Sequence, residues 1–335
     1  RTFGEMRDAG ITAVGEFHYL HHGPDGEGHA FDRLVLDAAA EAGIRIAFLS
    51  AFYQTGGIDR PVEAAQRRFA TLSDESFWES VDRLTEELDP STQTLGVAAH
   101  SVRGVPLSNI VRLHEEASRR GLVFHLHVEE QRQEIEACVA RYGKTPMALL
   151  NRELEIDSRF TAVHCTHTAP AELERFAAAG GNVCVCPLTE ANLGDGTPDL
   201  GSLLKVPGPA GRLSLGTDSN TRIAMIEEMR WLEYGQRLKG EARGRITDED
   251  GDVARALLSI ATLGGARSLG IEAGEIVPGR WGDFITLDLQ APALTDSDAD
   301  TLLAAWVFGG GNAAVAETCA GGKWRDRRPG SVPEG

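Results

Sequence analysis

Several histidines and carboxylates of this sequence stand at the end of apolar runs, where they could bind a metal ion or carry a proton. In VFHLHVEEQRQEIEAC, residues 123–138, His127 ends such a run and Glu130 follows three residues later. A neutral imidazole binds divalent cations, and a nearby carboxylate can pass protons to and from water beside the cation. Alternation along a strand places His125 and His127 on one face. A buried histidine pair with a glutamate at a helix start remains the alternative.

Two further motifs carry the same kinds of side chain. In TAVHCTH, residues 161–167, His164 ends an apolar run, and His167 in the following loop is the weaker candidate. A lone histidine at a strand end is more often structural than catalytic. In LSLGTDSN, residues 213–220, Asp218 follows Gly216, which lets the backbone turn sharply. Asp218 could ligate a metal and accept a proton, or it could cap the next helix.

A third set of residues is suited to an anionic substrate. AAHSVRG, residues 98–104, contains His100 and Arg103. Arginine offers a planar fork that matches a carboxylate, although a surface salt bridge is the alternative. In EFHYLHH, residues 16–22, Tyr19 can donate a hydrogen bond to an anion, whereas His21 and His22 are predicted to be solvated.

The elements that must position these residues alternate along the chain. Short apolar runs predict strands, and the amphipathic stretches between them predict helices. The predicted strands are Thr12–Phe17, Ile44–Ser50, Thr94–Ala99, Val123–His127, Phe160–His164, Val183–Cys186 and Leu213–Gly216. The predicted helices are Asp32–Ala42, Ser76–Leu88, Leu107–Arg120, Glu130–Ala140, Ala171–Ala179 and Ala224–Leu238.

The polar residues cluster at the carboxyl ends of the predicted strands. In an eight-stranded α/β barrel those ends converge on one mouth, whereas an open doubly wound sheet gathers them only at a switch point. The sequence therefore predicts an α/β fold, a TIM-type (β/α)8 barrel lacking its first strand. Residues 1–268 are assigned to the barrel (strands 2–8). Residues 269–335, with short runs at Asp283–Leu289 and Ala304–Phe308, are assigned to the C-terminal part of a small β-sandwich domain and a tail.

The composition limits the choice of partners. The 335 residues include 33 basic and 50 acidic side chains, a net charge of −17, which argues against nucleic acid and anionic membranes as partners. An anionic substrate would have to be held by a few local arginines. The five cysteines, odd in number and mostly within apolar runs, predict reduced thiols in a cytoplasmic protein.

The motifs together resemble those of the amidohydrolase superfamily. Its deaminases have a similar order of motifs: H-x-x-E, then V-H, then T-D-S. They also have a closing segment similar to ATLGGARSLGIEAGEIVPGRWGDFITLD. Within the superfamily, the sequence resembles the formimidoylglutamate deiminases of histidine degradation. This closer resemblance is carried by EFHYLHH, HSVR, HVEEQRQEIEAC, TEANLGDG and EEMRWLEYGQRL.

The resemblance implies one zinc ion per subunit, a homodimer and a small acidic substrate. It implies that His127 and Asp218 bind the metal, and that Asp218 also belongs to the catalytic residues with His164 and Glu130. His164 would take a proton from the zinc-activated water, and Glu130 would pass protons to the substrate nitrogen. Tyr19, His100 and Arg103 would hold the substrate carboxylates. The implied reaction is hydrolysis of N-formimino-L-glutamate to N-formyl-L-glutamate and ammonia.

One feature of the family has no counterpart in the sequence. The family carries an H-x-H pair on its first strand and substrate-binding Gln and Arg residues near it. Without that pair, zinc lacks the three protein ligands of an ordinary catalytic site. The sequence thus predicts that this chain, as given, is inactive and does not retain zinc. Two alternatives stay open: a deaminase of purines or other cyclic amidines, which Arg103 and Tyr19 argue against, and a non-catalytic relic that binds acidic amino acids.

Overall fold

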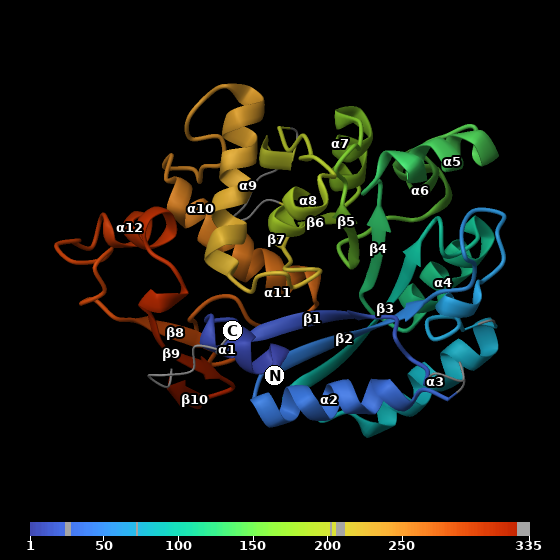
Figure 1. The fold of residues 1–335 in the computed structure, drawn as a ribbon, viewed down its shortest axis with the longest axis horizontal. Helices are drawn as coiled ribbons and strands as arrows, with labels where there is room; N and C mark the ends of the chain where they lie inside the picture. Colours follow the sequence, from blue (N-terminus) through green and yellow to red (C-terminus); the bar gives the residue numbers. More distant parts are fainter. Residues whose placement is uncertain (24–27, 72, 202, 206–211, 327–335) are drawn as a thin grey trace.

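The computed structural model describes residues 1–23, 28–71, 73–201, 203–205 and 212–326. Its main feature is a curled sheet of seven parallel strands, in which each strand pairs with its neighbours in sequence order (Figure 1). The strands are β1 (Ala13–His18), β2 (Arg45–Phe52), β3 (Gln93–Ser101), β4 (Phe124–Val128), β5 (Phe160–His164), β6 (Asn182–Val185) and β7 (Leu213–Leu215). The predicted barrel-type α/β fold is confirmed by this sheet.

Helices alternate with the strands. They are α1 (Thr2–Asp8), α2 (Ala30–Ala42), α3 (Asp74–Glu87), α4 (Leu107–Arg119), α5 (Arg132–Tyr142), α6 (Pro146–Glu153), α7 (Pro170–Ala178), α8 (Pro187–Leu193), α9 (Met225–Gly240), α10 (Val253–Ser259), α11 (Gly265–Ser268) and α12 (Leu302–Gly309). A π-helical turn, Ile260–Gly264, joins α10 to α11. In Figure 1 the helices from α2 to α9 follow the curve of the sheet from its lower edge to its top.

The predicted elements of the sheet and its helices agree with the structure to within two residues at each end. The agreement follows from burial on both faces: every residue of β2, β4 and β5 is buried. Strands covered on both sides read as continuous apolar runs, which stand out against the amphipathic helices between them.

A second, smaller sheet lies near the end of the chain. It is antiparallel, with β9 (Val315–Ala320) between β8 (Phe284–Leu287) and β10 (Lys323–Asp326). The expectation that Ala304–Phe308 belongs to a β-rich appendage is wrong, because this run lies within α12. A short apolar run without alternation does not distinguish a strand from a buried helix. The domain boundary after residue 268 stays a prediction, and residues 327–335 of the predicted tail lie outside the described residues.

Two general expectations can be checked on the described residues. All five cysteines are free, as predicted. No helix in the described ranges is both long enough and apolar enough to cross a membrane.

A buried carboxylate ties down the loop that follows β1. Asp32, in the first turn of α2, accepts hydrogen bonds from His18 Nε2 (3.1 Å), His21 Nδ1 (2.8 Å) and His29 Nδ1 (3.2 Å). Burial alone would raise the pKa of Asp32, but these three hydrogen bonds outweigh it and hold the pKa well below its usual range. His21 Nε2 also donates to the carbonyl oxygen of Ala51 at 2.9 Å. Both ring nitrogens of His21 therefore lie within hydrogen-bond distance of oxygen atoms, and Asp32 joins the three histidine rings.

The prediction that His21 and His22 are solvated is wrong. Their exposed fractions are 0% and 5%. The motif EFHYLHH does not contain Asp32, which lies eleven residues after His21 and accepts a hydrogen bond from its buried ring. Since the hydrogen bonds from His18 and His21 flank Tyr19 in sequence, the cluster also fixes the backbone that carries Tyr19.

Replacing Asp32 by asparagine is expected to lower the free energy of unfolding by about 3–5 kcal/mol, because the three histidine rings lose the buried carboxylate that accepts their hydrogen bonds. Urea unfolding at pH 7 measures the change. Asp37→Asn is the control: Asp37 lies on the same helix, pairs with Arg33 at 2.8 Å on the surface and should matter by less than about 1 kcal/mol. Equal losses in the two variants would contradict this role of Asp32.

Candidate active site

The backbone is strained where β4, β5 and β7 end. Glu129, His164 and Asp218 have positive φ values of 53°, 72° and 43°, which non-glycine residues rarely adopt. Such conformations cost free energy and concentrate at functional sites. Each of these residues either belongs to the predicted site or lies next to one of its members, so the strain and the chemistry coincide.

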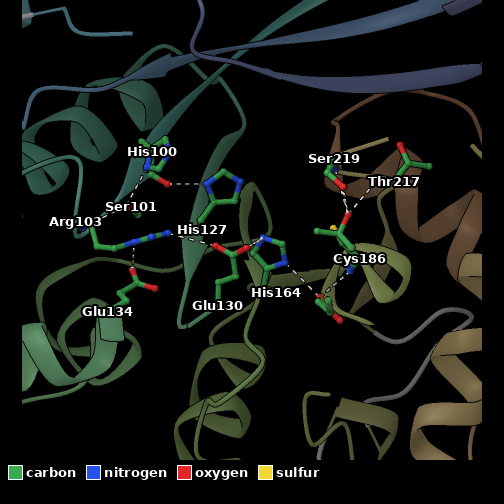
Figure 2. Close-up of polar contacts among 12 residues, drawn as sticks. His100, Ser101, Arg103, His127, Glu130, Glu134, His164, Cys186, Thr217 and Ser219 are labelled. Atoms are coloured by element: carbon green, nitrogen blue, oxygen red, sulfur yellow. Dashed lines mark hydrogen bonds and ion pairs between the residues drawn. The ribbon is translucent and has the colours of Figure 1, made fainter. Parts of the chain in front are cut away.

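Three of the predicted residues offer donor atoms at one point. Ligand atoms of His127, His164 and Asp218 all lie within 4.8 Å of one another. His127 donates from Nδ1 to the carbonyl oxygen of His100 at 2.9 Å (Figure 2). Burial, followed by the neighbouring His100 and His164, lowers the pKa of His127 well below its ordinary value. The ring is therefore neutral, and the Nε2 lone pair is left for a cation.

The orientation of His127 is also fixed by an aromatic ring that was not among the predicted site residues. Phe17 of β1 stacks on the His127 imidazole with ring centroids 4.1 Å apart. His127 and His164 lie nearly parallel, with centroids 5.4 Å apart. The alternation of side chains along β1 could have indicated this contact, because it places Phe17 toward the inside of the curled sheet and His18 toward α2.

Glu130 stands between the donor cluster and the substrate-side residues. One carboxylate oxygen lies 3.9 Å from His164 Nε2, and the other accepts a hydrogen bond from Arg103 Nη2 at 3.3 Å (Figure 2). Glu130 was expected at the start of a helix, but α5 begins at Arg132. Glu130 therefore lies in the turn after β4, and its carboxylate does not cap α5.

The predicted substrate-binding residues lie beside Glu130 in one cavity of about 1050 Å³, which the three donor residues also line. The rings of Tyr19 and His100 meet edge to face at 5.3 Å. Burial and then Arg103 lower the pKa of His100 to about 3, so its ring is neutral. Burial, with Asp218 and Glu130 adding to it, raises the pKa of Tyr19. Tyr19 is thus a neutral hydrogen-bond donor, and Arg103 is the cation of this group.

Arg103 is held by a carboxyl group that the sequence did not single out. Glu134, on the first turn of α5, lies with Oε1 3.8 Å from Arg103 Nε (Figure 2). Burial raises the pKa of Glu134 to about 7, although Arg103 acts in the opposite direction. The alternative of a simple surface salt bridge for Arg103 is wrong, because its partner Glu134 is buried.

His164 has a second carboxylate partner on its other side. Its Nδ1 lies 3.3 Å from Glu190 Oε1. Burial acts to lower the pKa of His164, but the hydrogen bond and charge of Glu190, with Glu130 and Asp218, raise it to about 9. A metal ion held beside the ring would act in the opposite direction and favour the neutral ring, which can accept a proton. Glu190 follows the predicted strand Val183–Cys186, but no role was predicted for it from the sequence. Asp218, in turn, does not cap the following helix, which begins at Met225 after Ala224.

The fold and this cluster at the strand ends define a class of protein that comparison with known families identifies. Residues 1–325 match the amidohydrolase family, and the chain belongs to it. The resemblance seen in the sequence motifs is thereby confirmed at the level of the family.

Among characterised relatives, the chain is similar to the formimidoylglutamate deiminase of Pseudomonas aeruginosa. The two are 37% identical over 332 residues, 97% of this chain and 72% of that enzyme. It is also 27% identical to the 5'-deoxyadenosine deaminase of Methanothermobacter thermautotrophicus over 295 residues, 87% of this chain and 62% of that enzyme.

Solved structures show the same fold. An amidohydrolase from Brucella melitensis superposes with a TM-score of 0.85 at 33% identity, over 96% of this chain and 71% of that one. An adenosine deaminase from Xanthomonas campestris, solved with bound zinc, gives 0.78 at 24% identity, over 97% of this chain and 69% of that one. The second likeness concerns the fold alone.

Proposed function

We propose that this chain forms the site of a formimidoylglutamate deiminase, which hydrolyses N-formimino-L-glutamate to N-formyl-L-glutamate and ammonia. The observation that carries the proposal is the position of Glu130. It joins the donor cluster of His127, His164 and Asp218 to Arg103, a cation suited to a substrate carboxylate. The likeness to the Pseudomonas aeruginosa deiminase supports this choice of substrate.

The types of donor atom in the cluster suit a zinc ion. His127 presents a neutral imidazole whose orientation is fixed from behind, and Asp218 presents a carboxylate, both of which zinc accepts. These two residues would hold the ion, with His164 beside them. Zinc, when bound, lowers the pKa of a water molecule to about 7 and polarises the atom under attack.

His164 and Glu130 divide the proton transfers in this proposal. His164, with Nε2 turned toward Glu130, receives the proton that water loses as its oxygen bonds to the formimino carbon. Glu130 delivers a proton to the terminal nitrogen, the carbon–nitrogen bond breaks and ammonia leaves. A protonated amine is a far better leaving group than an amide anion.

Arg103, Tyr19 and His100 would hold the carboxylates of the substrate. The Arg103 guanidinium can form two parallel hydrogen bonds to one carboxylate. Tyr19 donates a neutral hydrogen bond, and the neutral His100 ring adds a third polar edge. The net charge of −17 opposes an acidic substrate at long range, so this local group has to supply the affinity.

Ammonia release from N-formimino-L-glutamate by zinc-loaded protein, fused to the H-x-H strand of the family, tests the proposal. We expect turnover with this substrate and at least about 100-fold lower kcat/KM with adenosine or 5'-deoxyadenosine, because a neutral ring leaves Arg103 without a partner. The reverse preference would identify a ring deaminase. Binding of glutamate by metal-free protein without turnover would identify a binding protein.

The expectation that residues 1–335 alone are inactive stays a prediction. His127 and Asp218 are fewer protein ligands than an ordinary catalytic zinc site has. Zinc content and ammonia release, measured side by side for residues 1–335 and for the same chain fused to the H-x-H strand of the family, decide the matter. Equal values would contradict the expectation.

A further inference from the structure

Glu190 is a buried carboxylate that belongs to the site by contact but has no part in the chemistry described above. It lies in the first turn of α8, with 2% of its surface exposed. Its Oε1 accepts the backbone N–H of Cys186 at 2.9 Å and also faces His164 Nδ1 at 3.3 Å. The Cys186 contact fixes the carboxylate, so the position of Oε1 is set independently of His164.

The two nitrogens of the His164 ring face opposite carboxylates. Nδ1 points to Glu190, and Nε2 points to Glu130 at 3.9 Å and to the donor cluster. In a neutral imidazole one nitrogen carries the proton and the other accepts, and the hydrogen bond at one side decides which. A carboxylate at Nδ1 requires the proton there.

We propose that Glu190 is a positioning residue, which holds the proton of neutral His164 on Nδ1 and so leaves the Nε2 lone pair free to accept a proton in the active site. The inference rests on the proposed function of His164 as proton acceptor. When Nε2 takes a proton, the ring becomes a cation, and Glu190 supplies its counter-charge. A carboxylate that orients an imidazole and stabilises its cation has the same logic as the aspartate of the serine protease triad.

The backbone of His164 gives a reason for such an anchor. His164 and Cys165 both have positive φ values, 72° and 54°, so the end of β5 is held away from its preferred conformation. Such a segment keeps its geometry only where its surroundings fix it. Within the described residues, the hydrogen bond to Glu190 is the one made by the His164 side chain, because the distance to Glu130 is too long for another.

Two substitutions separate the charge of Glu190 from its hydrogen bond. Glu190→Gln keeps an oxygen that can accept from both Cys186 and His164 but removes the counter-charge. We expect kcat to fall about 10-fold. Glu190→Leu also removes the acceptor, so the proton of His164 is no longer held on Nδ1. We expect kcat to fall about 100-fold, with KM within about 3-fold of the original protein in both variants.

Glu228→Gln is the matched control. Glu228 is fully buried in α9, accepts the N–H of Leu188 at 2.9 Å, and has a pKa raised to about 8, mainly by burial. It is therefore neutral at pH 7, and glutamine copies its shape and charge. We expect kcat within about 2-fold of the original protein, because this substitution alters only the local packing of α9.

A second readout needs no substrate. Nitrogen-15 NMR of histidine-labelled, zinc-loaded protein at high pH distinguishes a ring protonated at Nδ1 from one protonated at Nε2. We expect His164 to carry its proton on Nδ1 in the original protein and in Glu228→Gln, and to lose that preference in Glu190→Leu. An unchanged spectrum in Glu190→Leu would overturn the inference, as would a changed spectrum with unchanged kcat. If N-formimino-L-glutamate is not the substrate, the spectra still decide the role of Glu190.

Discussion

Replacing Asp218 by asparagine is expected to lower ammonia release by about 10³- to 10⁴-fold and to remove most of the bound zinc. Asp218 offers a carboxylate oxygen within 4.8 Å of the donor atoms of His127 and His164. An amide is neutral, so it is a weaker ligand and cannot take up a proton. Asparagine tolerates the left-handed backbone that Asp218 adopts, with φ at 43°, so the loss is not caused by strain.

Metal content and turnover have to be measured together for this variant. Asp300→Asn, a change on an exposed residue, is the control and should keep both at the level of the original protein. If Asp218→Asn retained zinc but lost turnover, Asp218 would act on protons only. Full retention of both would show that the metal and the chemistry lie elsewhere.

The parallel sheet was predictable because strands that are buried on both faces appear in the sequence as continuous apolar runs. β5 was predicted at its observed ends, Phe160–His164, since a buried strand bounded by polar residues has sharp limits in the sequence. The small sheet was less predictable. The run Ala304–Phe308 is a helix that packs its Trp306 and Val307 inward, and a short apolar segment does not show which period it follows.

For the candidate site, the sequence placed side chains on strand ends but could not show which of them share partners. His127 and His164 were found because each ends an apolar run, and Asp218 because it lies in the turn that follows one. Glu190 and Glu134 were given no role, since each sits on a helix at an ordinary acidic position and its partner comes from another strand. The same limit explains the error on His21, whose burial depends on a hydrogen bond to Asp32 of α2.

Arg103 lies between two acidic side chains, Glu130 and Glu134, and is the residue expected to bind a substrate carboxylate. The guanidinium contacts Glu130 at 3.3 Å and Glu134 at 3.8 Å. A substrate carboxylate would compete with Glu130 for the guanidinium and leave Glu130 free for the reacting nitrogen. Substrate binding and the release of Glu130 are thereby coupled through one side chain.

Arg103→Met is expected to lower kcat/KM for N-formimino-L-glutamate by about 10²- to 10³-fold, because a buried carboxylate loses its charged partner. Arg103→Lys should recover part of this loss, since lysine keeps the charge but not the fork. Arg112→Met on α4, which removes a surface pair with Asp74, is the control and should change kcat/KM by less than about 2-fold.

The methionine variant also leaves Glu134 buried beside Glu130 without its cation. Adding Glu134→Gln removes that charge, so a defect that persists in the double variant belongs to the substrate contact. The defect should also shrink when the substrate is N-formimino-L-glutamine, which lacks one carboxylate, if Arg103 binds the side-chain carboxylate. Loss of the same size with N-formimino-L-glutamine would assign Arg103 to the α-carboxylate, and no loss with either compound would exclude it from substrate binding. Arg103 is expected to affect both substrate binding and the release of Glu130. Arg103→Met should therefore lower kcat as well as raise KM.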